Sequence, residues 1–440
     1  MQERRYKSYL IYLLMVILAF NQLDRMALGI VLQDIKTELS ASDTQLGFLT
    51  GIAFASFYAV MGLPIAHWAD RGNRITILSV TVALWSIAVS ATAFVGNFLQ
   101  LLAVRVVTAV GEAGCMPPAH SLIADEFTRA ERPRAVSIFI LGGPLALLIG
   151  YFAAGWLNQF YGWRLTFVIL GAPGLALALL ALLTLREPRK TKNLSKSPAP
   201  VSPTSNQPNV IAVFSILWRN RAFRHLLICY SLWFLFAYGL LQWMPSFFIR
   251  SHGLSTGELG TWSSLVWGVA GGAGCILGGE LATRFAAHRE RQQLRGCAIA
   301  FSFFSVLSAA AFLVSDYHWA FGLLALAALG GNTSQGPMLA TMQSLVPPHL
   351  RAMSIAIVYF FANLIGMGLG PLLAGVISDT LHPFFGDEAL RYALVAMCPG
   401  YLWAAWHQWQ ASETVDRDLA DSITSTSDAD DAALGVSEHA

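Results

Sequence analysis

Long apolar runs, separated by short polar stretches, follow one another along the chain as far as residue 410. Each run has roughly 20 or more residues, enough for a helix to cross a hydrocarbon core of about 30 Å. The runs lie near residues 8–32, 45–68, 75–95, 98–122, 134–158, 165–186, 222–249, 258–284, 295–315, 318–345, 351–378 and 389–410. This pattern predicts an all-α polytopic membrane protein with 12 transmembrane helices.

Composition and charge support this interpretation and suggest an orientation. The chain is 55% hydrophobic and only 12% charged, which excludes two soluble domains of this length. If the N-terminus lies inside, only four basic residues fall outside: Lys36, Arg164, Arg250 and Arg391. Two more lie within the membrane, and all the others face the cytoplasm. This bias predicts that both termini are cytoplasmic and that the number of spans is even.

A polar segment divides the spans into two sets of six. Residues 187–210 are rich in Pro, Ser, Thr, Asn and Lys, which is typical of a linker. The tail beyond Ser412 is rich in Ser, Thr, Asp and Ala, and we expect it to be disordered. The predicted parts are an N-terminal six-helix bundle (1–186), a cytoplasmic linker (187–218), a C-terminal six-helix bundle (219–411) and a cytoplasmic tail (412–440).

Short internal repeats indicate that the two halves are related. The sequence Gly150-x3-Ala-Gly155 recurs as Gly370-x3-Ala-Gly375. Transporters built from repeated halves commonly bind their substrate near the bilayer midplane, at the interface between the halves.

Full charges in the middle of apolar runs mark the candidate site. Arg105 and Glu112 are seven residues apart, almost two helical turns, and so share a helix face. Asp24 and Arg25 interrupt the first run, on one face with Asn21. Charges at this depth are costly and typically serve a function. Because burial favours a neutral carboxyl group while a nearby arginine favours the ionised form, these residues predict a proton site beside an anion site.

The fourth run continues past Glu112 into Pro117 and Pro118, which predict a kinked or loosened helix. His120 follows eight residues after Glu112, on nearly the same face. It is a candidate for relaying a proton or contacting the substrate, and the alternative is a hydrogen-bonded packing histidine.

The segment Gly62-Leu-Pro-Ile-Ala-His-Trp-Ala-Asp70-Arg71-Gly72-Asn73-Arg74 closely resembles the loop between the second and third helices of the major facilitator superfamily. The resemblance implies a latch that closes the cytoplasmic side. Gly72 would permit a tight turn and Gly62 a close approach of helices. We expect Arg134, at the start of the fifth run, to take part in the same gate. The alternative is a basic turn that only sets topology.

Further motifs narrow the resemblance. Arg105-x5-Gly-Glu-Ala113, Arg134-Ala-Val-Ser-Ile-Phe139 and Gly150-Tyr-Phe-Ala-Ala-Gly155 are similar to bacterial members of the Spinster family of lysophospholipid and sphingolipid transporters. The similarity is dense over residues 20–175 and faint in the second half. It implies two six-helix bundles of the major facilitator fold. It also implies that Asp24 and Glu112 carry protons and that Arg25 and Arg105 bind the headgroup.

The second half offers uncharged candidates for the opposite wall of the site, among them Trp243, Asn332 and Tyr359. If they face inward, the site is charged on one wall and aromatic on the other, which suits an amphiphile. Otherwise they belong to the core or face lipid.

The predicted function is proton-coupled transport of an anionic, lipid-like molecule by alternating access, in a bacterial inner membrane. Proton-coupled symport of small organic anions such as sugar acids is the alternative, because symporters of the same superfamily carry similar charge patterns. A lipid enzyme and a transport-dead sensor rank lower, since no nucleophile elbow, metal cluster or signalling domain is recognisable. We expect a monomer, with the substrate, protons and membrane lipids as partners and no nucleic acid. No phosphate-binding loop, metal site or cofactor is predicted.

Overall fold

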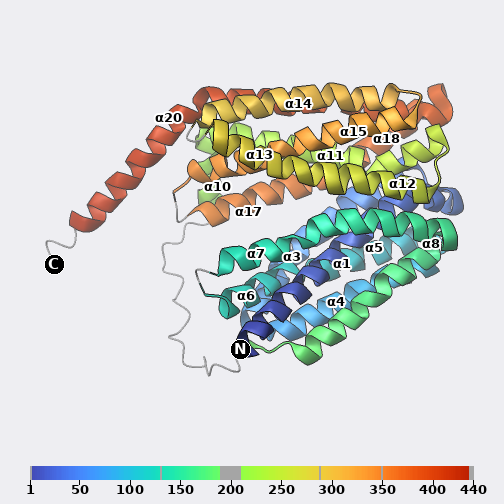
Figure 1. The fold of residues 1–440 in the computed structure, drawn as a ribbon, viewed down its shortest axis with the longest axis horizontal. Coiled ribbons are helices and arrows are strands. Elements are labelled where there is room, and N and C mark those ends of the chain that lie inside the picture. Colours follow the sequence, from blue (N-terminus) through green and yellow to red (C-terminus); the bar gives the residue numbers. More distant parts are fainter. Residues whose placement is uncertain (1, 129–130, 189–209, 287–288, 348–349, 436–440) are drawn as a thin grey trace. The chain divides into compact units, whose positions relative to one another are not determined.

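The computed structural model describes residues 2–128, 131–188, 210–286, 289–347 and 350–435, and every regular element in these ranges is a helix (Figure 1). The earlier elements are α1 (Gln2–Leu39), α2 (Asp43–Phe48), η1 (Leu49–Ala53), α3 (Phe54–Arg71), α4 (Arg74–Ala91), η2 (Thr92–Phe94), α5 (Phe98–Glu112), α6 (Met116–Glu126), α7 (Arg132–Ile140) and α8 (Gly142–Thr184). The later ones are α10 (Val210–Arg219), α11 (Arg221–His252), α12 (Thr256–Ser263), η4 (Ser264–Ala270), α13 (Gly271–Phe285), α14 (Glu290–Leu313), α15 (Tyr317–Thr333), α16 (Gln335–Ser344), α17 (Arg351–Phe361), η6 (Ala362–Met367), α18 (Gly368–Phe385), η7 (Gly386–Glu388), α19 (Ala389–Met397) and α20 (Gly400–Gly435).

Nine helical segments within these ranges are long and apolar enough to cross a membrane. Two of them, Arg134–Thr184 with 51 residues and Met353–Ala420 with 68, are more than twice the length that one crossing needs. The first of these bends at Gly162, whose φ of 74° favours glycine. Residues 318–345, expected as one span, form the shorter helices α15 and α16. These features are consistent with twelve spans, and the predicted all-α membrane fold is confirmed.

The chain forms two compact units. The first comprises Met1–Ser202, Tyr238–Val269 and Met367–Leu394, and the second comprises the remaining segments. The first unit therefore combines stretches from both sides of the predicted linker, whereas the second contains none that precedes it. Among the described residues the chain passes from one unit to the other inside α11, η4, η6 and α19, and two of these elements, η4 and η6, are π-helical. Single π-helical turns often occur at functional positions.

In the first unit, α8 packs along α1 and α4 (Figure 1), while α12 packs on α8 and α18 packs on α2 and η1. Glycines make the last two contacts close. A Cβ atom on Gly155 would lie 2.3 Å from the Thr256 carbonyl oxygen, and one on Gly375 would lie 2.3 Å from that of Asp43. Both glycines end the repeated sequence motif, so the two copies serve equivalent helix contacts.

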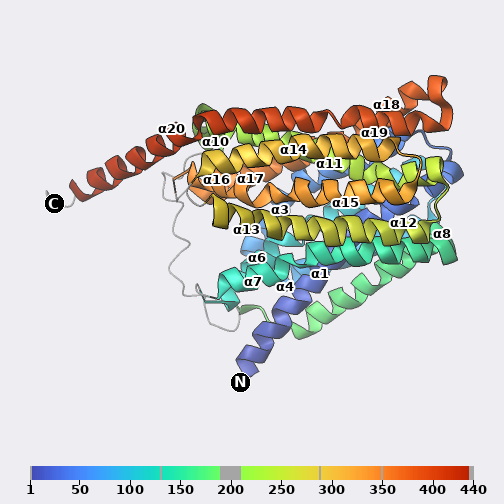
Figure 2. The same cartoon turned by 45° about the horizontal axis from the view of Figure 1, so that its top comes forward.

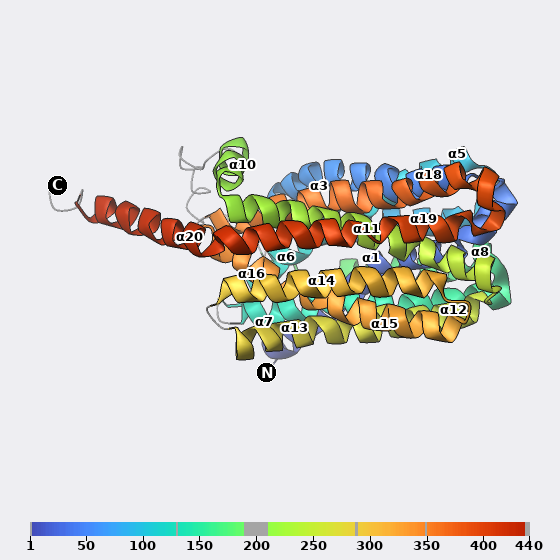
Figure 3. The same ribbon diagram turned by 90° about the horizontal axis from the view of Figure 1, so that it is seen from above.

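In the second unit, α14 lies between α15 and α20 (Figures 2 and 3). Helix α20 continues to Gly435, past residue 412, where the sequence predicts the start of a disordered tail. Its Glu413, just past that point, pairs with Arg291 and Arg295 of α14. Of the predicted linker, residues 189–209 lie outside the described residues.

Candidate functional site

The charged residues of the first and fourth predicted spans come together as two ion pairs between α1 and α5. Arg25 donates to Glu112 Oε2 from Nε at 2.9 Å and from Nη2 at 2.6 Å. Arg105 Nη1 donates to Asp24 Oδ2. The four side chains carry two positive and two negative formal charges, so this four-charge cluster is neutral when both acids are ionised.

The cluster is buried. Glu112 is fully buried, Asp24 is 3% exposed and Arg105 is 7% exposed, whereas the Arg25 side chain is the most accessible of the four at 12%. Taking ion pairs out of water is costly, and the attraction between the charges compensates only when further hydrogen bonds satisfy the remaining polar atoms. The completeness of the hydrogen bonding therefore decides what the cluster can do.

The hydrogen bonding of the cluster is incomplete. Asp24 Oδ1, Glu112 Oε1 and Arg105 Nε are buried, and none has a hydrogen-bond partner among the described residues. Since an ionised carboxylate can only accept hydrogen bonds, a proton on either acid would give it a donor that it otherwise lacks.

An aromatic side chain links the two arginines. The Phe54 ring centroid lies 4.6 Å from Arg25 Cζ and 4.3 Å from Arg105 Cζ, and the Tyr58 ring lies 5.1 Å from Arg25 Cζ. Cation–π attraction at these distances holds both guanidinium groups beside one ring. Phe54 was not predicted from the sequence, because an aromatic residue in an apolar helix gives no signal of its own.

Asn21 and a helix break position the acid of α5. Asn21 Nδ2 donates to the backbone carbonyl of Glu112 at 3.3 Å. Helix α5 ends at Glu112, and α6 begins at Met116 with prolines in its first turn. The predicted interruption beyond Glu112 is therefore present, and the backbone N–H groups of Gly114 and Cys115 donate to the last carbonyls of α5, those of Gly111 and Glu112, at 3.1 Å each.

The other predicted binding residues lie apart from the bonded cluster. The His120 ring packs edge-on against Phe139, with centroids 5.4 Å apart. Trp243 is fully buried and donates its indole N–H to the Pro371 carbonyl oxygen at 2.8 Å, so this group already holds α11 to α18.

Two predicted binding residues belong to the second unit. Asn332 Nδ2 donates to the Ala328 carbonyl at 2.7 Å within α15. Tyr359 is 40% exposed and meets the Tyr230 ring edge-on at 6.0 Å. Tyr359 is thus accessible at the end of an aromatic cluster, while the amide N–H of Asn332 caps its own helix.

At the predicted latch, Arg74 is fully buried. It pairs with Glu187 at the end of α8 and, at 2.6 Å, with Asp125 of α6. Its Nη1 also donates to the Ser121 hydroxyl oxygen at 2.9 Å, and its backbone N–H donates to Glu187 at 2.8 Å. Glu187, which the sequence analysis assigned to the linker, is therefore part of the bundle.

The two latch glycines differ from their predicted roles. Gly72 has φ −98° and ψ −174°, which other residues also adopt. A Cβ atom there would lie 2.9 Å from both the Trp68 carbonyl oxygen and Ile77 Cδ1, so space and not backbone conformation requires glycine. At Gly62 a Cβ atom would meet no atom within 4 Å, and the expected close helix approach is absent at this position of the described structure.

The remaining latch candidates are less informative. Arg71 and Arg134 are exposed. Asp70 lies in the last turn of α3, and its side chain is outside the described residues.

A second buried acid, which the sequence analysis missed, joins four helices of the first unit. Asp43 accepts hydrogen bonds from Lys36 at 2.6 Å, from two Arg250 nitrogens at 2.7 Å each, and from the Ser378 hydroxyl at 2.7 Å. The Asp379 carboxylate accepts from the backbone N–H groups of Asp43 and Thr44. We call Lys36, Asp43, Arg250, Ser378 and Asp379 the outer cluster. Lys36 and Arg250 could have indicated this cluster from the sequence, since they are two of only four basic residues predicted to lie outside.

The described residues contain no group of three or more His, Cys, Asp or Glu side chains placed to hold a metal ion. The five cysteines all lie in the described ranges, and none forms a disulfide bond. The chemistry of the site therefore rests on carboxyl, guanidinium and aromatic groups.

Comparison with known proteins gives consistent matches. The family model described as Major Facilitator Superfamily matches residues 14–405. An MFS-type efflux pump of Mycolicibacterium smegmatis is 32% identical over 405 residues, covering 91% of each chain. A hexuronate transporter of Bacillus subtilis is 26% identical over 382 residues, covering 85% of this chain and 88% of that transporter.

Among solved structures, a bacterial homologue of the human lysosomal transporter Spinster, in an inward-facing and unoccupied conformation, has a TM-score of 0.83 and 28% sequence identity. The match covers 94% of this chain and 98% of the other. All these proteins are transporters and not enzymes.

Proposed function

Because this chain belongs to the major facilitator superfamily of membrane transporters, we propose that it couples protons to the movement of an anionic, lipid-like substrate. The observation that carries this proposal is the incomplete hydrogen bonding of the four-charge cluster. Two buried acids and two arginines share a site in which two carboxyl oxygens and one guanidinium nitrogen have no partner among the described residues.

Glu112 and Asp24 are the proposed proton carriers. Protonation of Glu112 would neutralise the partner of Arg25 and leave the cluster with a net positive charge. A buried positive charge attracts an anion, so proton binding and anion binding would be linked through Arg25 and Arg105. Which arginine the substrate takes would decide whether that linkage favours symport or antiport.

The substrate class rests on similarity. The solved structure most relevant here is the Spinster homologue, and the motifs around Glu112 and Gly155 resemble the same family. We therefore propose a single-chain anionic amphiphile, of the lysophospholipid or sphingoid phosphate type. A sugar acid is the second candidate, supported by the similarity to the Bacillus subtilis hexuronate transporter.

Alternating access would involve closure on both sides of this site. We propose that Arg74, together with Gly62, Asp70, Arg71, Gly72 and Arg134, belongs to a cytoplasmic gate, and that the outer cluster closes the opposite side. This assignment rests on the predicted orientation, with both termini in the cytoplasm of a bacterial inner membrane. We also propose that the transporter acts as a monomer, with six helices on each side of the linker.

A ligand screen by thermal shift tests the substrate class. Purified protein would be heated with lysophospholipids, sphingoid phosphates or sugar acids, with uncharged single-chain detergent as the control for nonspecific effects. Stabilisation by the anionic amphiphiles that disappears in Arg105→Ala would support the proposal. Stabilisation by sugar acids alone would reject the lipid-like substrate in favour of the second candidate.

A further inference from the structure

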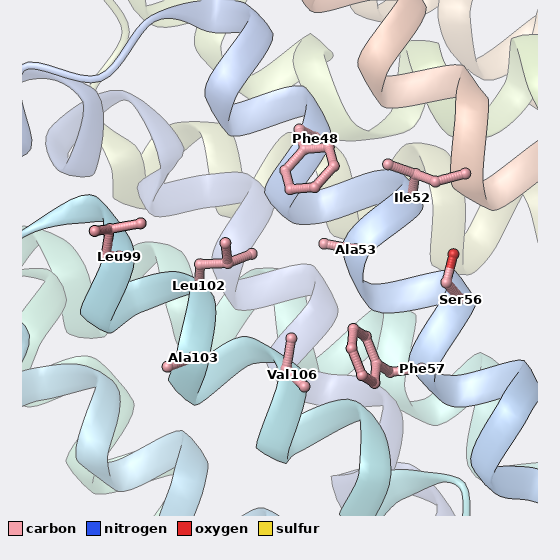
Figure 4. Close-up of a pocket in the computed structure, with 9 residues that line it drawn as sticks. All are labelled: Phe48, Ile52, Ala53, Ser56, Phe57, Leu99, Leu102, Ala103 and Val106. Carbon is pink, nitrogen blue, oxygen red and sulfur yellow. The ribbon is translucent and has the colours of Figure 1, made fainter.

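An apolar groove lies in the first unit between η1–α3 and α5 (Figure 4). Its volume is about 550 Å³, within the range of small-molecule sites. The lining residues from η1–α3 and the preceding turn face those from α5 across the gap. They are Phe48, Ile52, Ala53, Ser56, Phe57, Leu99, Leu102, Ala103 and Val106.

The chemistry of the lining restricts what can occupy the groove. Ser56 contributes the single side-chain polar group among these residues, and the others are aliphatic or aromatic. The two walls belong to segments long and apolar enough to span a membrane. Leu99 at one end is 72% exposed and Phe57 at the other is 43% exposed, so the groove opens on the outer surface of these helices. A hydrocarbon chain fits this surface, whereas a hydrophilic solute would lose its hydration without gaining partners.

On both walls, a lining residue is the sequence neighbour of a residue that belongs to or contacts the four-charge cluster. Val106 follows Arg105 on α5, and Ala53 precedes Phe54 at the junction of η1 and α3. Phe54 is buried and contacts both guanidinium groups. The π-helical turn η1 (Leu49–Ala53) forms part of this wall, where the regular helical stacking of side chains is interrupted.

From the apolar lining and its position beside the cluster residues on both helices, we propose that the groove holds the hydrocarbon chain of the anionic amphiphile. The chain enters sideways from the bilayer between α3 and α5, and displacement of the Phe54 ring brings the headgroup to Arg105 and Arg25. This inference rests on the proposed function, because it requires an amphiphilic substrate. It adds a route and a chain-binding surface that the charge cluster alone does not imply.

Two adjacent valines give a matched test. Val106 lines the groove, while its neighbour Val107 is 41% exposed and does not. Val106→Trp fills the groove, and Val107→Trp adds the same bulk outside it. Binding of lysophosphatidate with chains of increasing length would be measured on both variants, with glycerol phosphate as the chain-free competitor.

For the wild type and Val107→Trp we expect affinity to rise with chain length. For Val106→Trp we expect long-chain affinity to fall at least tenfold while glycerol phosphate competes as before. Equal long-chain binding by both variants would overturn the groove proposal and leave the lipid-like substrate intact. Failure of the wild type to bind any lysophosphatidate, with sugar acid binding retained, would instead reject the proposed function together with the groove.

Photolabelling of the wild-type protein provides a measurement that does not depend on folding of a variant. A lysophosphatidate with a diazirine in its chain would be activated in proteoliposomes, and the labelled peptides would be mapped. We expect labels within residues 48–57 and 99–106, reduced by excess unlabelled lipid. Competable labelling confined to other segments would overturn the proposal.

Discussion

The four-charge cluster and the outer cluster both contain carboxylate and guanidinium groups, but they differ in how many hydrogen bonds their buried acids accept. Asp43 accepts hydrogen bonds on both oxygens, with Arg250 bidentate and Lys36 and Ser378 completing the set. Asp24 and Glu112 each have a buried oxygen without a partner among the described residues. A carboxylate whose oxygens both accept hydrogen bonds favours one arrangement of helices. A carboxylate with an oxygen that accepts none can still bind a proton or a ligand.

Arg74 and its partners Glu187, Asp125 and Ser121, which we call the Arg74 cluster, show the same distinction for a buried arginine. Arg74 is fully buried, like Glu112, yet its guanidinium group is bonded to Glu187, Asp125 and Ser121. Burial alone therefore does not distinguish the proposed transport site from the proposed gates. What distinguishes the proposed transport site is that buried polar atoms of Asp24, Glu112 and Arg105 have no hydrogen-bond partner among the described residues.

The largest expected effect is in Glu112→Gln, which keeps the size of the side chain but cannot exchange a proton. We predict that stimulation of transport by a pH gradient disappears and that membrane insertion stays close to wild type, while the melting temperature falls because Arg25 loses its charged partner. Uptake into proteoliposomes, with and without an imposed gradient, measures this. A variant that responds to the gradient as the wild type does would remove Glu112 from the coupling mechanism and break the comparison.

The same comparison shows what could be predicted from sequence. Apolar run lengths gave the all-α membrane architecture, and spacing placed Asp24, Arg25, Arg105 and Glu112 together, because charges in apolar helices have few places to go. The motif near Arg74 identified the superfamily.

Tertiary contacts account for what was missed. Phe54 reaches the two arginines only through the packing of α3 against α1 and α5, and apolar helices are full of such rings. Asp43 follows a loop, and its side chain is bonded to Arg250 of α11 and Ser378 of α18 only in the folded chain. Both partners are more than 200 residues away in sequence. Local pattern carries no information about such long-range pairing.

The next largest effect is expected for Arg74→Ala, which removes the buried guanidinium group that pairs with Glu187 and Asp125. Removing one member of a buried ion pair costs about 3–5 kcal/mol, so we predict a clear drop in melting temperature and yield. Thermal denaturation in detergent measures this, and Arg71→Ala, at an exposed neighbouring arginine, is the control. Equal melting temperatures for the two variants would show that the ion pairs and hydrogen bonds of Arg74 do not stabilise the bundle.

A smaller effect is expected for Asp43→Asn, which retains the shape of the side chain but loses its charge. Hydrogen bonds to charged groups contribute about 1.5–3 kcal/mol. We therefore predict a shift of roughly 10- to 100-fold towards an arrangement in which α2 and the adjoining end of α1 separate from α18. Electron–electron distance measurements between spin labels at the exposed residues Thr37 and Thr380 would detect it. The exposed acid Glu38 provides the control variant Glu38→Gln, and an unchanged distance distribution in Asp43→Asn would contradict a gating role for the outer cluster.

The smallest effect is expected at Glu413, which pairs with Arg291 and Arg295 on an exposed part of the second unit. Water and salt screen such pairs, and many exposed ion pairs contribute nothing measurable to stability. We predict that Glu413→Gln leaves both the melting temperature and gradient-driven uptake at wild-type values, even though it removes more ion-pair contacts than Glu112→Gln does. A loss of gradient-driven uptake in Glu413→Gln would mean that the number of ion pairs, and not the unmade hydrogen bonds of a buried acid, determines where coupling occurs.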